Sequence, residues 1–287
     1  MRVIYAVLFV MAIPAAQERP LPDYETFAAQ VKAHLATDEE RQSGYGFMER
    51  RVEQKLDGSG RIQDESVKTF EVYPGLPGED RYRRLIEEDG TRVRPDRLAK
   101  QDRERQKRVD AYARKVSSTA TPSERQSIAR ADDKVRREYN AAVDDVFRVY
   151  DIRMEGREQI DGHDTIAATL VPKPGVKPLT RDGKVMQHFK ARAWISESDY
   201  ELVRVEIEAI DTLSFGLGLL ARIHKGTVAA YERRRVNNEV WLPAKVTWTA
   251  SARVALVRRL RIRGASEFSN YRKFTVDTST TYAQPPR

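Results

Sequence analysis

The sequence contains no cysteine, and histidine is scarce. The missing cysteine excludes a disulfide framework, a cysteine-ligated zinc or iron–sulfur site, a thiol nucleophile and a lipidated N-terminal cysteine. The four histidines fall on separate predicted elements, and no two have the i, i+4 or i, i+2 spacing of metal ligands: His34, His163, His188 and His224. We therefore expect no metal site and no cofactor.

Catalytic motifs are also missing. No strand–turn–helix context with a nucleophile elbow is present, and the glycines at 216 and 218 precede neither a phosphate-binding loop nor a dinucleotide-binding unit. The acidic pairs at 132–133 and 144–145 fall on strongly charged predicted helices, where solvated faces are their ordinary role. We expect no catalytic residues and a protein that is not an enzyme.

Long hydrophobic runs are absent apart from one at the N-terminus. The strictly apolar stretch Val3–Ile13 is eleven residues long, whereas a helix needs about 20 residues to cross a bilayer. Arg2 precedes the stretch, and the small residues Ala15 and Ala16 follow it. This order predicts a signal peptide over residues 1–16, cleaved near Ala16, and an exported mature protein. An uncleaved anchor or a buried strand is the alternative.

The chain that follows the predicted signal peptide is long enough to form a hydrophobic core. The chain has 287 residues, of which 40% are hydrophobic and 33% charged, with a formal net charge of +8. A chain of this length buries a core without disulfides, so we expect a single domain over residues 17–287.

Most of that domain is predicted to be strand. Phe189, Ala191 and Ala193 alternate with charged residues, which is the period of a half-buried strand. An initial helix is predicted over residues 23–40. The predicted strands cover residues 45–56, 62–73, 82–88, 147–158, 163–171, 189–195, 203–209, 226–236, 239–250, 253–263 and 267–276.

The fold class that follows is mainly β (α+β). Short connections favour antiparallel neighbours in a meander, and a sheet this wide must curl. We expect an incomplete barrel of about eleven antiparallel strands, with the N-terminal helix and a helical hairpin as a lid or insertion.

The hairpin is the charged stretch 92–145. It is rich in strong helix formers, and it breaks near Pro122, which suits the first turn of a second helix. We predict helices over 96–116 and 123–145, each with one narrow apolar stripe that covers another surface.

The apolar half of the strands is expected to line the concave face. The candidate ligand-lining residues are Val203, Val205, Ile207, Phe215, Leu217, Leu219, Val246 and Trp248. Arg258 breaks the alternation of its strand, and an unpaired buried charge is costly, so it is a candidate for contacting a ligand head group. The glycine-containing run Leu213–Leu220 is predicted to be either a strand that fills the core or a mobile lip of the hollow.

The order of several segments resembles the LolA/LolB-like superfamily of outer-membrane lipoprotein-sorting proteins. The resemblance covers mainly residues 147–282. It rests on Asp161-Gly162, Val171-Pro172-Lys173-Pro174, Ala193-Trp194-Ile195-Ser196, Leu202-Val203-Arg204-Val205 and Asn238-Glu239-Val240-Trp241-Leu242-Pro243.

The resemblance implies a periplasmic carrier that shields lipid or lipoprotein acyl chains in a hydrophobic half-barrel. Its expected partners are a lipid or acylated protein and, transiently, a membrane surface; no nucleic acid is expected, and the chain is expected to be a monomer. The alternative is a non-enzymatic envelope scaffold that docks an anionic partner through the basic hairpin 92–145.

Overall fold

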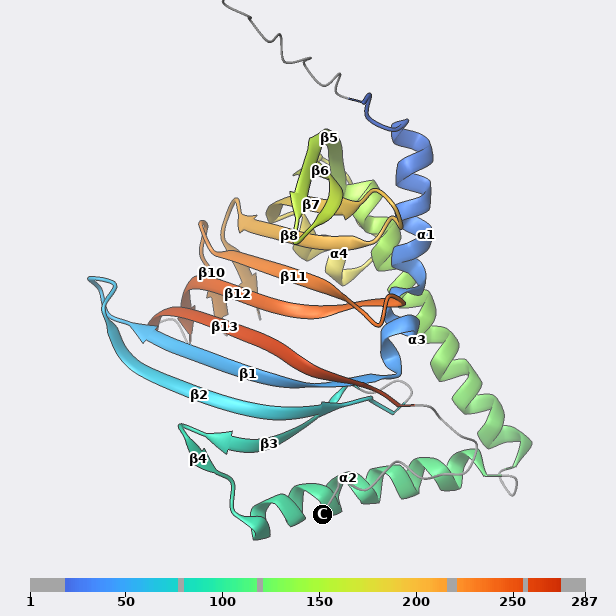
Figure 1. Cartoon of the computed structure of the whole chain (residues 1–287), viewed down its shortest axis with the longest axis vertical. Coiled ribbons are helices and arrows are strands. Elements are labelled where there is room, and N and C mark those ends of the chain that lie inside the picture. The colour runs from blue at the N-terminus through green and yellow to red at the C-terminus, as the bar shows by residue number, and fades with distance from the viewer. Residues whose placement is uncertain (1–18, 77–79, 118–120, 216–220, 255–257, 275–287) are drawn as a thin grey trace, which may run out of the picture.

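The computed structural model describes residues 19–76, 80–117, 121–215, 221–254 and 258–274 (Figure 1). In this part of the chain, four α-helices accompany one large antiparallel sheet. None of the described helices has the length and hydropathy to cross a membrane. The expected signal peptide, residues 1–16, lies outside the described residues, and the single-domain division stays a prediction.

The first helix, α1 (Tyr24–Ser43), begins at an N-cap. The Asp23 carboxylate accepts a hydrogen bond of 2.9 Å from the backbone N–H of Thr26, which satisfies one of the free donors of the first turn. Phe27 and Val31, one turn apart, are the buried residues of the helix. The amphipathic spacing in the sequence therefore predicted both the helix and its buried side.

The charged stretch forms the predicted helical hairpin. Helix α2 spans Pro95–Val116, and α3 spans Pro122–Val149, which runs into the first strand after it. Thr121 and Glu124 form a reciprocal capping box at the start of α3. A fourth, short helix, α4, covers Arg181–Met186.

The strands follow in chain order. They are β1 (Tyr45–Leu56), β2 (Ile62–Tyr73), β3 (Tyr82–Glu88), β4 (Thr91–Arg92), β5 (Tyr150–Ile160), β6 (His163–Pro172), β7 (Phe189–Ser196), β8 (Leu202–Ala209), β9 (Leu213–Phe215), β10 (Ala221–Ile223), β11 (Val228–Val236), β12 (Val240–Val254) and β13 (Arg258–Lys273).

Eleven of these strands form one open sheet in the order β4-β3-β2-β1-β13-β12-β11-β8-β7-β6-β5. The short β9 and β10 pair beside β12. Strands β1 to β4 form one meander, and β5 to β8 with β11 to β13 form another, as the short connections predicted. These two halves of the sheet join where β1 pairs with β13. Among the described strands the edge strands β4 and β5 do not meet, so the predicted incomplete barrel with helices is confirmed.

The end of the sheet differs from the prediction of separate strands at 253–263 and 267–276. The strand β13 runs straight through Gly264, which lies between the two predicted strands. The reason is packing: Gly264 lies opposite Trp248 on β12, and a Cβ at Gly264 would overlap the Trp248 ring. The glycine makes room for an aromatic side chain on the neighbouring strand.

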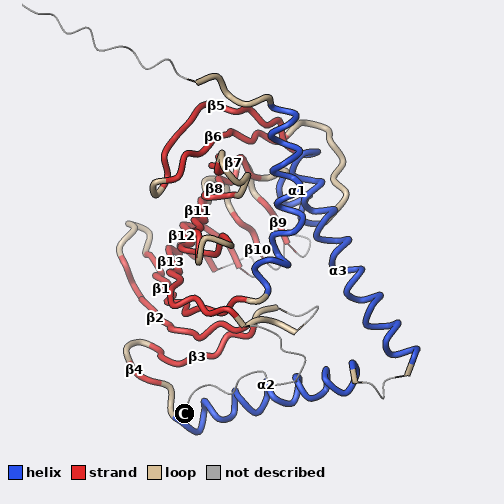
Figure 2. The backbone as a smooth tube through the Cα atoms, turned by 45° about the vertical axis from the view of Figure 1, so that its right-hand side comes forward, coloured by secondary structure: helices blue, strands red, loops and turns tan. Residues whose placement is uncertain are grey.

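The main core lies between the sheet and the helices. Figure 2 shows α1 and α3 along one side of the sheet, which we call the helix face. The largest cluster of buried residues on that face joins α1 to β5, β6 and β7: Phe27, Val31, Tyr150, Ile166, Ala168, Leu170, Ala191, Ala193 and Ile195. Partly buried Val205 and Ile207 of β8 pack against it. The apolar half of these strands is therefore occupied by helices.

Alkaline pH is expected to destabilise the protein through its tyrosines. Burial raises the pKa of five phenols to about 12: Tyr73, Tyr139, Tyr150, Tyr231 and Tyr271. A free tyrosine has a pKa of about 10, so the neutral phenols stabilise the fold fully below about pH 10. That contribution is lost as pH rises from about 10 to about 12. The urea midpoint of unfolding, followed by far-UV circular dichroism, should fall over this window.

The variant Tyr150→Phe provides the control. The Tyr150 hydroxyl donates a 2.9 Å hydrogen bond to the carbonyl of Met186, so the variant loses some stability at pH 8. Because it has one fewer shifted phenol, its midpoint should fall less steeply above pH 10. Equal slopes for the two proteins would contradict the assignment.

Candidate functional site

A pocket of about 830 Å³ lies on the sheet face opposite α1. Successive side chains of a strand point to opposite faces. Arg192 and Glu206 line the pocket, whereas their neighbours Ala193 and Val205 pack towards α1. The lining comes from seven neighbouring strands, β1, β13, β12, β11, β8, β7 and β6, so this face must be hollowed. We call this pocket the groove.

Small side chains form the floor of the groove. Ala230, Thr247, Ala265 and Val52 are direct cross-strand partners on β11, β12, β13 and β1. With strands about 4.8 Å apart, this row extends for about 14 Å across the sheet. All four residues are only partly buried. The floor is thus a shallow trough of short side chains that an extended ligand can contact.

Charged side chains stand on both sides of the floor. Lys190 pairs with Glu208 at 2.8 Å on one side, and Lys245 pairs with Glu267 at 3.9 Å on the other. Each pair joins two adjacent strands. Such half-exposed pairs contribute little to stability, but they fix charged groups along the walls of a small-residue floor.

An aromatic side chain on β7 packs against two of the arginines that line the groove. The Trp194 ring lies between Arg192 and Arg204, whose guanidinium carbons are 4.8 and 5.4 Å from its centroid. Its indole N–H donates a 2.7 Å hydrogen bond to Glu158, and Trp194 is 4% exposed. Arg192 is itself held by Glu155 and Glu158. These contacts hold Arg192 and Arg204 in place at the β7 and β8 side of the groove.

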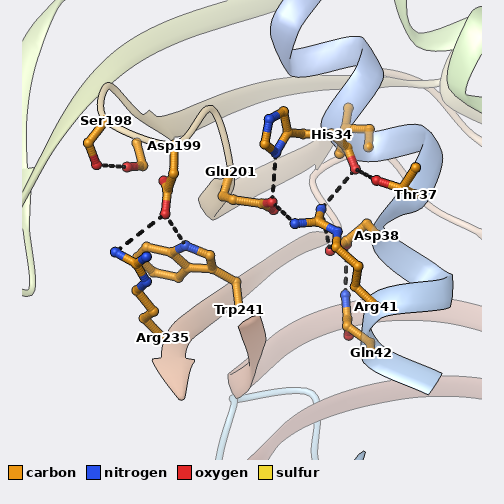
Figure 3. Close-up of polar contacts among 12 residues, drawn as sticks. His34, Thr37, Asp38, Arg41, Gln42, Ser198, Asp199, Glu201, Arg235 and Trp241 are labelled. Carbon is orange, nitrogen blue, oxygen red and sulfur yellow. Dashed lines mark hydrogen bonds and ion pairs between the residues drawn. The ribbon is translucent and has the colours of Figure 1, made fainter. Parts of the chain in front are cut away.

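A network of buried charges lies on the helix face (Figure 3). Arg233 of β11 donates 2.6 Å hydrogen bonds to Asp38 of α1 and to the carbonyl of Trp241. Glu201, which precedes β8, pairs with Arg41 of α1 and lies 3.7 Å from Arg233. The network fastens α1 across the sheet, which is a structural role.

A second part of Figure 3 adds to this fastening. The Trp241 indole N–H donates a 2.9 Å hydrogen bond to Asp199, and Arg235 lies 3.7 Å from the same carboxylate. His34 of α1 contacts Glu201 through Nδ1 at 3.0 Å. No cluster of three or more potential metal ligands is found among the described residues.

The predicted lining residues do not form one group. Val203 is 1% exposed, Val205 and Ile207 pack against the main core, and Val246 packs against a second cluster of Phe47, Val72 and Phe268. Ile207 and Trp248 also contribute atoms to the groove. Leu217, Leu219 and the side chains of Phe215 and Arg258 lie outside the described residues. The roles of all the predicted lining residues, and of Arg258, as ligand contacts remain predictions.

Sequence reasoning missed the floor of the groove because it treated the apolar half of each strand as the ligand surface. The groove lies on the other half. A signal was present: Ala230 and Ala265 are small residues placed two positions from charged ones, Glu232, Arg263 and Glu267. Short side chains at the same register of three adjacent strands leave a trough between charged walls.

The charged hairpin braces the β3 end of the sheet. Asp102 of α2 accepts hydrogen bonds of 2.7 and 3.0 Å from Arg84 on β3. The Gln101 side chain bonds to both the N–H and the carbonyl of Leu85 on the same strand. The role of the charged hairpin as a lid or as a docking arm stays a prediction.

No protein-family model matches the chain, and no curated protein matches it in sequence. A comparison with solved structures does find chains that are similar to this one. A LolA superfamily protein of Nitrosomonas europaea is 12% identical, with a TM-score of 0.37, over 86% of this chain and 93% of its own. An outer membrane lipoprotein-sorting protein domain of Vibrio parahaemolyticus is 9% identical, with a TM-score of 0.38, over 90% and 97%.

A complex of MucA and MucB from Pseudomonas aeruginosa is also similar, at 8% identity and a TM-score of 0.25, over 87% of this chain and 99% of that one. The solved structures to which this chain is similar therefore include LolA superfamily and outer membrane lipoprotein-sorting proteins, as its sequence predicted.

Proposed function

We propose that the protein is a non-enzymatic carrier of the bacterial envelope that shields the acyl chain of a lipid or lipoprotein. The observation that supports this function is the groove across seven strands, with its floor of small side chains. Its volume of about 830 Å³ lies within the range of about 300–1,000 Å³ that small-molecule pockets occupy. The N-terminal pattern of residues 1–16 supports a periplasmic location.

The groove suits an amphipathic ligand. A hydrocarbon chain laid over Ala230, Thr247, Ala265 and Val52 gains about 0.8 kcal/mol for each buried CH₂ group. The wall pairs Lys190–Glu208 and Lys245–Glu267 satisfy one another, so a hydrocarbon chain between them separates neither pair. No residue of a described helix lines the groove, so a ligand can reach the floor from solvent. Binding and release then require no chemical step.

Filling the floor tests this proposal. Ala265→Trp places a large ring in the trough and should lower the uptake of a twelve-carbon lipid or a hydrophobic dye at least about tenfold, because each displaced CH₂ forfeits about 0.8 kcal/mol. Uptake is measured by native mass spectrometry and by dye fluorescence on the mature protein.

Ala131→Trp is the matched control, since Ala131 is exposed on α3 away from the sheet. It should bind like the wild type. Thermal unfolding of both variants should match the wild type within a few degrees, because Ala265 is only partly buried. A wild-type protein that takes up neither lipid nor dye would overturn the proposed function.

A further inference from the structure

One cation of the groove differs from the others. Five cationic side chains line it: Lys190, Arg192, Arg204, Lys245 and Arg263. The first four each have a carboxylate within 4 Å, at separations from 2.5 to 3.9 Å. Among the described residues no carboxylate lies within that distance of the Arg263 guanidinium. Arg263 therefore holds the uncompensated positive charge of the groove lining.

A neutral amide positions this charge. The Gln54 side-chain oxygen accepts hydrogen bonds of 2.9 Å from Nε and 2.7 Å from Nη2 of Arg263. The Gln54 amide nitrogen donates in turn to Glu65, at 2.5 Å. Glu65 thus orients the amide, and the amide orients the guanidinium without neutralising it. The other N–H groups of the guanidinium make no hydrogen bond to a described residue, which leaves donors for a ligand.

Arg263 stands beside the floor, next to Ala265 along β13. On β13 it is two residues from Ala265 and therefore on the same face, and its cross-strand partners are Thr249 and Gln54, both of which line the groove. From Ala265 the floor continues over Thr247 to Ala230. A ligand with its head at Arg263 can therefore lay its tail along the floor.

We propose that Arg263 binds the anionic head group of the ligand, a carboxylate or a phosphate, and selects acyl ligands that carry one. The inference rests on the proposed carrier function and assigns its head-group site. A guanidinium is the side chain best suited to this task, because its planar donors match the oxygens of either group. A ligand with one negative charge would complete the charge pairing of the groove.

Three twelve-carbon probes with different heads test the proposal: dodecanoate, dodecyl phosphate and neutral dodecanol. Affinities are measured with the mature protein by displacement of a hydrophobic dye. The wild type should bind at least one anionic probe about tenfold or more tightly than dodecanol, as a charge-assisted hydrogen bond allows. Arg263→Gln should remove this preference, so that the anionic probes bind no more tightly than dodecanol. The better of the two anions identifies the head as carboxylate or phosphate.

A second variant keeps the arginine. Gln54→Glu replaces the amide that accepts the hydrogen bonds of the Arg263 guanidinium with a carboxylate. The new carboxylate neutralises the guanidinium, so this variant should also abolish the preference for anions. Arg263→Lys should retain part of it, because the charge remains. Arg136→Gln, an equal change of charge at an exposed position on α3, should retain all of it.

The outcomes separate the two proposals. Dodecanol binding that Ala265→Trp abolishes supports the carrier function whatever the head group does. If the wild type binds dodecanol and the anions equally, or if Arg263→Gln keeps the preference, the head-group assignment is overturned and the carrier function stands. If none of the probes binds, both are overturned.

Discussion

Replacing Arg233 with alanine is expected to lower the free energy of unfolding by about 3–5 kcal/mol, the cost of breaking a buried ion pair from one side. The Arg233 side chain is 1% exposed, and it faces Asp38 at 2.6 Å and Glu201 at 3.7 Å. Without it, Arg41 is the remaining arginine beside these two poorly hydrated carboxylates, and Gln42 and His34 are their other side-chain contacts. Urea denaturation at pH 7 measures the loss.

The next residue provides the control. Arg234 is exposed, and Arg234→Ala should change the free energy of unfolding by no more than about 0.5 kcal/mol. Arg233→Lys keeps the charge but not the two-donor geometry, so its loss in the free energy of unfolding should lie between the losses of Arg233→Ala and Arg234→Ala. Since the network joins α1 to the sheet, hydrogen exchange in residues 24–43 should rise selectively in Arg233→Ala. Equal stability of Arg233→Ala and Arg234→Ala would show that the network does not hold α1.

Gly264→Val is expected to destabilise the protein by about 1–3 kcal/mol, the usual cost of overpacking. Strand propensity alone predicts the opposite sign, because valine is favoured in strands and glycine is not. The structure reverses the sign, since the new side chain would overlap the Trp248 ring. Thermal and urea unfolding measure the change.

Gly156→Val is the matched control. Gly156 also lies in a strand, β5, but nothing lies within 4 Å of the position where its Cβ would be. This substitution should be neutral or stabilising. In a double-mutant cycle, Trp248→Leu should relieve part of the cost of Gly264→Val, with a coupling of about 0.5–3 kcal/mol. Additive effects would show that the ring is not the cause.

Local patterns predicted most elements of the fold. The spacing of Phe27 and Val31 predicted α1, and Pro122 with its neighbours predicted the start of α3. These signals act within one turn of chain, so the sequence carries them directly. The pairing of β1 with β13 has no such signal, because it joins residues more than 200 positions apart, such as Glu49 and Phe268.

The groove shows the same division. Alternation along β11 and β13 predicted that each strand has a polar and an apolar half, but not which half remains accessible to a ligand. That depended on α1, α3 and α4, which pack on the apolar half at β5–β8. The register of β11, β12, β13 and β1 then placed Ala230, Thr247, Ala265 and Val52 in one row.

The sequence by itself determined most of the elements, their antiparallel order within each half, and the lack of cysteine-based sites, because propensity, turn residues and hydrophobic period act over a few residues. Only the tertiary structure decided that Gly264 lies within β13 opposite Trp248, that Arg233 is buried between two carboxylates, and that Arg263 has an amide partner instead of an acid. Each of these depends on which distant strand or helix lies beside the residue, and the register of long-range packing sets that.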